Sequence, residues 1–573
     1  MQKHIIRREL NIDPAQLPSS LPLVLRRVYA ARGVDDALQL DNSVERLLSP
    51  DKLGGIARAL DLLEQAVVGE QKILIVGDFD ADGATSSALT LRALRSMGCD
   101  KVGYLVPNRF DYGYGLTPEI VAVAATQHPD LLITVDNGIS SLAGVAAAQA
   151  QGIRVLVTDH HLPGQQLPTA DAIVNPNLPG DPFPSKSLAG VGVAFYVMLA
   201  LRARLRDKGW FAARGMDEPN LANLLDLVAL GTVADVVPLD HNNRILVEQG
   251  LRRIRAGRCV PGITAMLQVG GRNPARTVAS DLGFAVGPRL NAAGRLEDMS
   301  LGIECLLAED TQTAQHIARQ LDQLNRERRD IEADMKAQAL SVLESLHLEE
   351  GSLPTGLCAF DPDWHQGVIG ILAARLKEKF HRPVIAFARA SEEEIKGSAR
   401  SVPGVHIRDC LEAVSTRHPG LIKKFGGHAM AAGLSLAEHD YPVFQALFDA
   451  EVSRHLSADD LHGVVHSDGS LDASELKLEL ADQLRSAGPW GQNFPEPIFE
   501  GVFEVTHQRI VGERHLKLNL RAENNTQLDA IAFNQEDLSD LTGMHVHLAY
   551  RLDANEFRGM RNLQLVVEHL ETV

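Results

Sequence analysis

The most constraining feature of this chain is an apolar pattern, typical of a buried strand, that is followed directly by charged side chains. Three alternate positions after the apolar run Ile73–Val76 are carboxylates: Asp78, Asp80 and Asp82. A second apolar run, Val155–Val157, leads into Asp159-His160-His161. Carboxylates beside a buried strand are costly unless their charge is compensated, and a divalent metal ion is the usual compensation. Two such strand ends predict a metal site at the carboxyl edge of a parallel sheet.

The pattern around these runs predicts a doubly wound α/β domain, because helical and strand patterns alternate along it. Helices are expected at 52–68, 84–97, 117–127, 141–150, 190–206 and 219–230. Strands are expected at 72–77, 101–106, 131–135 and 153–158.

Length and composition set the remaining frame. A chain of 573 residues should divide into about three or four domains. No apolar run approaches the roughly 18 residues of a membrane span, and residues 1–10 lack the apolar segment of a signal peptide, so a cytoplasmic protein is expected. The five scattered cysteines indicate reduced thiols. The net charge of −18 excludes a protein that coats nucleic acid by bulk electrostatics, so phosphates must be gripped locally.

The rest of the chain predicts a long helix, a second α/β unit and a barrel. Apolar residues recur at alternating steps of four and three between Ile317 and Leu346, with Arg328 at the one missing position. This spacing favours an amphipathic helix that bridges two domains, with a coiled-coil dimer as the alternative. Strands near 356–360 and 383–387 belong to the second α/β unit, and alternating strands at 499–505 and 515–520 indicate a small β-barrel. The expected domains are an N-terminal arm (1–45), an α/β domain (46–308), a connecting helix (309–348), a second α/β domain (349–457) and a barrel (458–573).

The first candidate ligands are the three aspartates after the first strand. On an extended strand end, alternate side chains face the same way, so Asp78, Asp80 and Asp82 can converge on one pocket. The alternative is an acidic helix cap, which needs only one aspartate. Asp136 likewise follows an apolar run, Leu132–Val135, although alone it would be interpreted as a cap or turn residue.

Asp159, His160 and His161 add oxygen and nitrogen ligands, a mixture that suits Mn²⁺ or Mg²⁺. His161 would point away from His160 if the strand continued, which would leave it to contact substrate. Asp235 is an isolated charge among apolar neighbours, either a ligand or a paired buried aspartate. Together these groups could hold two metal ions, the arrangement that activates water in phosphoester hydrolysis.

Several glycine-punctuated segments could bind phosphate through charged donors and backbone N–H groups. Alone, each is more typical of a tight turn, but their number beside a metal site favours a phosphate-bearing polymer. The candidate substrate contacts are Asn108, Arg109, Arg289, Asn291, Arg295, Ser398, Arg400, Gly427 and His428.

With Asp78–Gly83 followed by Asp159–His161, the chain resembles the DHH phosphoesterase superfamily. Further segments are similar to the RecJ family of bacterial single-stranded-DNA exonucleases within it, in family order and from about residue 45 to 573. These segments are Leu188–Ala194, Gly231–Asp235, Gly287–Arg295, Trp364–Gly370 and Phe425–His428.

The resemblance implies a DHH domain, a connecting helix, a DHHA1 domain and an oligonucleotide-binding barrel around a central groove. It implies 5′-to-3′ hydrolysis of single-stranded DNA to mononucleotides in recombination and repair, with Mn²⁺ or Mg²⁺, two ions to a site. It makes metal ligands of Asp78, Asp80, Asp82, Asp136, Asp159, His160 and Asp235. The catalytic set is these residues without Asp78 and with His161, which becomes a catalytic or scissile-phosphate contact.

The resemblance also implies a monomer, with single-strand DNA-binding protein and a RecQ-type helicase as partners. Two other functions stay open. One is a phosphodiesterase for short oligonucleotides or cyclic dinucleotides, although such enzymes usually lack the long helix and the barrel. The other is a catalytically inactive replication or repair scaffold, against which the intact acidic set argues.

Overall fold

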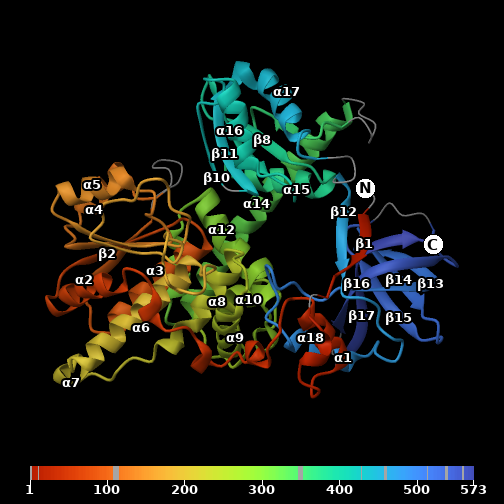
Figure 1. Ribbon diagram of the computed structural model, residues 1–573, viewed down its shortest axis with the longest axis horizontal. Coiled ribbons are helices and arrows are strands. Elements are labelled where there is room, and N and C mark those ends of the chain that lie inside the picture. Colours follow the sequence, from red (N-terminus) through yellow and green to blue (C-terminus); the bar gives the residue numbers. More distant parts are fainter. Residues whose placement is uncertain are drawn as a thin grey trace.

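The structure is a computed structural model that describes residues 3–10, 12–106, 115–345, 353–427, 429–456, 461–512, 514–535, 540–557 and 560–573. Figure 1 shows an α/β unit at one end, a helical region beside it, a second α/β unit above and a barrel at the other end. The fold class predicted from the sequence is confirmed. Among the described residues, no helix has the length and apolar character that crossing a membrane requires.

The first unit is built on a five-stranded sheet in which every neighbouring pair is parallel. Its strands are β2 (Ile73–Gly77), β3 (Val102–Leu105), β4 (Leu131–Val135), β5 (Arg154–Thr158) and β6 (Ala172–Val174). The order is β3-β2-β4-β5-β6, so the direction of winding reverses between β2 and β4. Ligands of open α/β sheets bind where the strand order reverses, outside the carboxyl ends of the strands.

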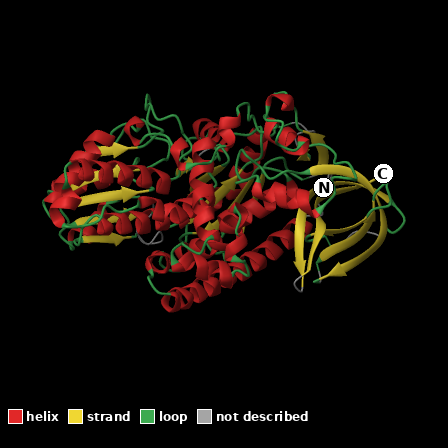
Figure 2. Ribbon diagram, turned by 90° about the horizontal axis from the view of Figure 1, so that it is seen from below, coloured by secondary structure: helices red, strands yellow, loops and turns green. Residues whose placement is uncertain are grey.

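Both faces of this sheet are buried, as a parallel sheet requires. Along β2, Ile73 and Ile75 face one apolar cluster, whereas Leu74 and Val76 face another. The helices of the sheet segment are α2 (Ile56–Val68), α3 (Ala81–Ser96), α4 (Pro118–Ala125) and α5 (Leu142–Ala150). Figure 2 shows helices on both sides of the strands.

A helical region follows the sheet and packs on α3. Its first helices are α6 (Gly190–Asp207), α7 (Trp210–Arg214), α8 (Leu225–Ala234), α9 (His241–Arg255) and α10 (Pro261–Val269). Three helices and a π-helical turn complete it: α11 (Ala279–Asp281), η7 (Leu282–Val286), α12 (Gly287–Leu296) and α13 (Ser300–Leu307).

The long helix α14 (Thr311–Ser345) spans two packing environments. Its first half packs against α10, α12 and α13, and its second half contacts α15 (Ile369–Phe380) of the second α/β unit. Its apolar stripe is therefore used within the chain, as the bridging prediction requires. Arg328, the one polar residue of the stripe, is buried and bonded to Asn325 and Glu332.

The second α/β unit has a five-stranded sheet of order β10-β11-β9-β8-β7. Its strands are β7 (Leu357–Phe360), β8 (Val384–Arg389), β9 (Glu394–Arg400), β10 (Lys424–Gly427) and β11 (Ala431–Ala437). Only β7 and β8 pair in parallel. Separate apolar clusters cover its two faces, and the helices besides α15 are α16 (Ile407–Arg417) and α17 (Tyr441–Val452).

The C-terminal unit is a closed barrel of order β13-β14-β15-β17-β16 with α18 (Leu478–Ser486) against it. Its strands are β13 (Phe499–Val511), β14 (His515–Arg521), β15 (Gln527–Ala532), β16 (His545–Phe557) and β17 (Met560–Thr572). The N-terminal residues join this end of the molecule: β1 (Lys3–Arg7) pairs in parallel with β12 (Gly463–Ser467), and α1 (Leu23–Ala30) follows (Figure 1).

Candidate metal centre

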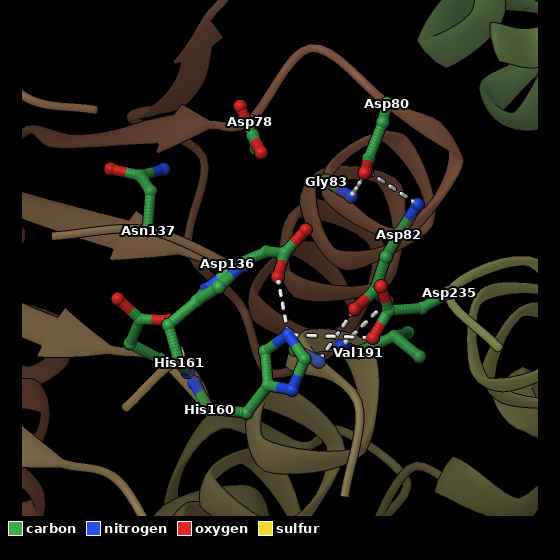
Figure 3. A network of polar contacts seen from close by, with 12 residues as sticks. Asp78, Asp80, Asp82, Gly83, Asp136, Asn137, His160, His161, Val191 and Asp235 are labelled. Atoms are coloured by element: carbon green, nitrogen blue, oxygen red, sulfur yellow. Dashed lines mark hydrogen bonds and ion pairs between the residues drawn. The ribbon is translucent and has the colours of Figure 1, made fainter. Parts of the chain in front are cut away.

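The predicted site residues gather where β2 and β4 end, but the three aspartates do not follow an extended strand. Strand β2 ends at Gly77, and Asp80 caps α3 by accepting hydrogen bonds from the backbone N–H groups of Asp82 and Gly83 (2.9 and 3.0 Å). Asp82 therefore lies in the first turn of the helix. The expected strand alternation is wrong. Because the chain turns into a helix, Asp78 and Asp80 group with Asp136, whereas Asp82 groups with His160 and Asp235 (Figure 3).

Asp82 is held by a second helix. The backbone N–H groups of Gly190 and Val191, at the start of α6, donate to its two carboxylate oxygens at 2.6 and 3.0 Å. A helix N-terminus carries partial positive charge, which favours a carboxylate there. Burial, followed by the neighbouring charge of Asp80, nonetheless raises the pKa of Asp82 to about 7.

Asp136 occupies a strained position directly after β4. Its φ is 61°, a left-handed conformation that is uncommon for residues other than glycine and that recurs at functional sites. A Cβ on Gly190 would lie 2.5 Å from the Cβ of Asp136, so only glycine leaves room for this carboxylate. Beside it, the amide of Asn137 donates to the carbonyls of Val76 and Val135 and ties β2 to β4.

His160 lies between two carboxylates. Its Nε2 is 3.1 Å from Oδ1 of Asp136 and 3.4 Å from Oδ2 of Asp235, which caps the end of α8. Burial lowers the pKa of His160 to about 4, so the ring is neutral at pH 7. All three atoms are buried and make no well-aligned hydrogen bond with the described residues. Unsatisfied polar atoms that converge in this way fit a cation between them.

Asp159 serves mainly to orient His161. Its carboxylate accepts hydrogen bonds from the backbone N–H groups of Ile139, His160 and His161 and lies 2.8 Å from Nδ1 of His161. Burial of His161 lowers its pKa, but the bond to Asp159 and the surrounding carboxylates outweigh this effect and leave the pKa raised. Strand β5 ends at Thr158, so the two histidines do not alternate: their ring centroids are 4.5 Å apart.

The electrostatics of the cluster favour a bound cation. Burial and the neighbouring aspartates raise the pKa values of Asp136 and Asp235 well above their usual range. Three overlapping groups each bring three potential ligand atoms within 4.8 Å of one another. They are Asp78, Asp80 and Asp136; Asp82, His160 and Asp235; and Asp136, His160 and His161. Mixed carboxylate and imidazole donors suit Mn²⁺ or Mg²⁺, and the shared Asp136 could bridge two ions.

Helix α12 runs along residues 78–83, which carry three of the candidate ligands and are called the metal loop below. The side-chain oxygen of Asn291 accepts from the backbone N–H of Ala81 (2.8 Å), and a Cβ on Gly294 would lie 1.9 Å from the carbonyl oxygen of Phe79. Arg289 points the other way: it is 6% exposed and paired with Asp322 of α14 at 2.7 Å. This arrangement fits a link between helices better than the substrate contact predicted for Arg289.

Three further substrate candidates, Arg295, Ser398 and Arg400, lie close to the start of α15. Arg295, at the end of α12, donates to the carbonyl of Gly367 (3.0 Å), just before α15 begins. A Cβ on Gly370, in the first turn of α15, would lie 3.0 Å from both Ser398 Oγ and Arg400 Nη2. Burial lowers the pKa of Arg400, and no carboxylate of the described residues pairs with it. The Arg400 guanidinium donates to Ser398 Oγ and to the carbonyl of Ala399. A helix N-terminus, a hydroxyl and a guanidinium without a carboxylate partner are groups that can bind an anion.

Gly427 lies on the same sheet, opposite Ala432, which faces Ala399 on β9. Its φ is 144°, and a Cβ added there would lie 2.5 Å from the carbonyl oxygen of Ala431, so both features require glycine. The candidates Asn108, Arg109 and His428 lie outside the described residues. No role was predicted from the sequence for Gly190, Val191 or Asn137, although the glycines of 188–194 were the available signal.

Comparisons with known proteins agree with this arrangement. Family models match in the order of the fold: the DHH family N-terminal domain over residues 72–232, the DHHA1 domain over 354–454 and the RecJ OB domain over 467–569. The single-stranded-DNA-specific exonuclease RecJ of Dickeya dadantii is 60% identical, with 97% of each chain covered. The chain belongs to the RecJ family.

Other RecJ proteins are similar over their whole length or most of it. The single-stranded-DNA-specific exonuclease RecJ of Escherichia coli is 55% identical, with 99% of each chain covered. The crystal structure of RecJ from Thermus thermophilus in complex with Mn²⁺ matches with a TM-score of 0.80 and 30% identity, covering 96% of this chain and 76% of that one. A structure of the same protein with Mg²⁺ matches with a TM-score of 0.74 and 28% identity, covering 96% of this chain and 75% of that one.

Proposed function

We propose that this chain is a metal-dependent exonuclease that hydrolyses single-stranded DNA from its 5′ end to mononucleotides, in recombination and repair. The observation that carries the proposal is the cluster of overlapping ligand groups at the reversal point of the sheet, in a chain of the RecJ family. The T. thermophilus structures with Mn²⁺ and Mg²⁺ support these two metals.

The side chains proposed to hold two ions are those of the three ligand groups other than His161, with Asp136 between the ions. Bound there, the ions would activate a water and stabilise the leaving oxygen of the phosphodiester. Asp159 bonds its carboxylate to backbone N–H groups and to His161, so its proposed role in metal binding is indirect. Both carboxylate oxygens of Asp82 also accept hydrogen bonds, from backbone N–H groups at the start of α6.

His161 is proposed to contact the scissile phosphate. Its raised pKa keeps the ring protonated over a wider pH range than a free histidine, and Asp159 fixes its Nδ1. The remaining ring nitrogen can then donate to a non-bridging phosphate oxygen. It can also return a proton to the leaving group.

The 5′-to-3′ polarity comes from the family resemblance, and a proposed anion pocket formed by Arg295, Ser398 and Arg400 would account for it. Arg295, Ser398 and Arg400 surround the start of α15, and Arg295 lies four residues after the Asn291 that contacts the metal loop. We propose that this pocket binds the terminal 5′ phosphate while the next phosphodiester lies on the metal site. Arg109, Asn108 and His428 remain candidates for the same task.

The test is digestion of a single-stranded oligonucleotide that carries a nuclease-resistant block at either its 5′ or its 3′ end, with Mn²⁺, Mg²⁺ or chelator. Protection by the 5′ block alone, with activity lost in chelator, is the expected result. Protection by the 3′ block alone would contradict the polarity. Cleavage restricted to very short oligonucleotides would favour the phosphodiesterase alternative, and no cleavage with any metal would favour the scaffold.

The expected setting is part of the same proposal. We propose a cytoplasmic monomer that works with single-strand DNA-binding protein and a RecQ-type helicase, on the strength of the family resemblance. Sedimentation of the purified protein, alone and with each partner, tests the oligomeric state and both interactions.

A further inference from the structure

We infer that Phe284 is a nucleobase-stacking residue at the mouth of the metal site. It would hold an unpaired base of a single DNA strand that leads away from the scissile phosphate. The inference rests on the proposed function and names one contact of the substrate.

Phe284 is presented to solvent on a well-anchored turn. Its side chain is 75% exposed, whereas Leu282, Ala285 and Val286 of the same turn η7 are buried. A phenylalanine ring left in water forgoes the stabilisation of burial, and stacking on a bound base would restore part of it. The turn is π-helical, a conformation that is rare and frequently found at functional sites.

The turn lies directly against the end of α8 that carries Asp235. A Cβ on Gly283 would lie 3.3 Å from Cγ1 of Val233, and a Cβ on Gly287 would lie 3.2 Å from Cβ of Ala234. Val233 and Ala234 immediately precede Asp235, whose Oδ2 faces His160. The turn that carries Phe284 therefore packs on the helix end that carries the ligand Asp235.

A second exposed apolar residue follows the same ligand. Val236 is 63% exposed and has a φ of 60°. Left-handed backbone is a strained conformation for a β-branched residue and persists only where its surroundings enforce it. Turn η7 and the end of α8 contact each other, and each is thus associated with an exposed apolar side chain, Phe284 and Val236.

Helix α12 indicates which part of the substrate would reach Phe284. Its first residue, Gly287, lies at Ala234, whereas Arg295 reaches Gly367 beside the anion pocket. Eight residues of helix separate the two ends by about 12 Å. A strand whose 5′ phosphate sits in the pocket and whose backbone crosses the metal loop therefore continues toward Phe284.

Base stacking is the contact that suits both the residue and the substrate. Every base has a π-face, so an aromatic ring binds single strands of any sequence. In a duplex each base is already stacked and paired, so Phe284 would favour an unpaired strand.

The experiment compares Phe284→Ala, Phe284→Leu and Phe284→Trp with a matched control, Val443→Ala, which trims a 54% exposed side chain on α17. Binding of a fluorescent single-stranded oligonucleotide to the metal-free proteins gives Kd, and digestion with Mn²⁺ gives KM and kcat. The alanine and leucine variants should raise Kd and KM about 10-fold, which corresponds to one base–aromatic stack. Tryptophan and the control should behave like the wild type.

A series of oligonucleotides with one abasic position each locates the stacked base. One position should weaken binding to the wild type by the same factor and have no further effect on Phe284→Ala. Wild-type DNA affinity of Phe284→Ala or of Phe284→Leu would overturn the inference. So would an abasic series in which every position weakens binding to Phe284→Ala as much as it weakens binding to the wild type. If the wild type digested no single-stranded DNA with any metal, the proposed function would fail. The binding series would still show whether Phe284 stacks on a base.

Discussion

At the scale of single residues, the centre of the site is a set of charges that the fold makes costly. Asp136 is buried, strained and adjacent to other carboxylates, and Gly190 is present because a Cβ would collide with it. Burial and mutual repulsion raise the pKa values of Asp136 and Asp235. Such a cluster is maintained against stability, which is typical of functional sites.

Replacing the central carboxylate should separate stability from function. Asp136→Asn removes a buried charge at almost constant shape, so the metal-free protein should unfold at a higher temperature than the wild type. Mutating a residue that only orients a metal ligand typically lowers metal affinity by roughly 10–100-fold. Asp136→Asn removes a ligand itself, so its Mn²⁺ affinity, measured by calorimetry, should fall by more than that. Asp100→Asn, at an exposed aspartate, serves as the control. Unchanged Mn²⁺ binding would exclude Asp136 as a ligand.

The response to pH should depend on the metal. A carboxyl whose pKa is raised on folding destabilises the protein once the pH exceeds its ordinary value, and the cost is complete above the raised value. For Asp82 that value is about 7. The metal-free protein should therefore become more stable as the pH falls from about 8 to about 6. Mn²⁺ should raise the unfolding temperature more at the higher pH than at the lower, as thermal unfolding at both values would show.

At the scale of elements, helix α12 links the metal cluster to the second α/β unit. One end lies against the residue before Asp235, its middle contacts the metal loop through Asn291, and Arg295 reaches the second α/β unit. The buried pair of Arg289 with Asp322 fixes this helix to α14. A displacement of α12 would therefore disturb the metal loop and the anion pocket together.

A methyl group on the contact face of α12 should have that effect. In Gly294→Ala the new Cβ would lie 1.9 Å from the carbonyl oxygen of Phe79, so the helix or the loop must move. Overpacking of this kind costs about 1–3 kcal/mol. We expect a lower unfolding midpoint in denaturant and a lower kcat. In the control Gly103→Ala the new methyl would meet only a Leu74 methyl at 3.7 Å, and wild-type kcat in both variants would argue against the contact.

At the scale of the whole molecule, the two ends of the chain close on each other. Arg32 forms an ion pair with Asp468 at 2.8 Å, and the two side chains are 1% and 0% exposed. The same guanidinium lies 5.2 Å from the ring centroid of Trp490, which stacks on Tyr29 and Phe494. These contacts join the segment after α1 to the residues that lead into the barrel.

Removing this attachment should loosen the barrel. Arg32→Ala leaves Asp468 buried without its main partner, a change that costs about 3–5 kcal/mol. Denaturant unfolding followed by tryptophan fluorescence should show an earlier transition. As a control, Arg46→Ala breaks an exposed pair with Asp41 and should cost less than about 1 kcal/mol. Equal effects of the two substitutions would contradict a special role for Arg32.

Much of the fold was predictable because its signals are local. The predicted strand 131–135 coincides with β4, and the strands and helices around it agree to within a few residues. Apolar runs and helical periodicity depend on neighbouring residues alone. The domain boundaries and the roles of the substrate contacts stay predictions.

By itself, the sequence determined the α/β pattern, the acidic strand ends, the bridging helix and the family resemblance. All of these depend on residue type and short spacing. Only the tertiary structure decided that Asp80 caps a helix, that Asp159 orients His161 and that Arg289 pairs with Asp322. It also brought Asp235, at a helix end far along the chain from His160, to 3.4 Å from that ring. Such contacts join distant segments through packing, which no local pattern encodes.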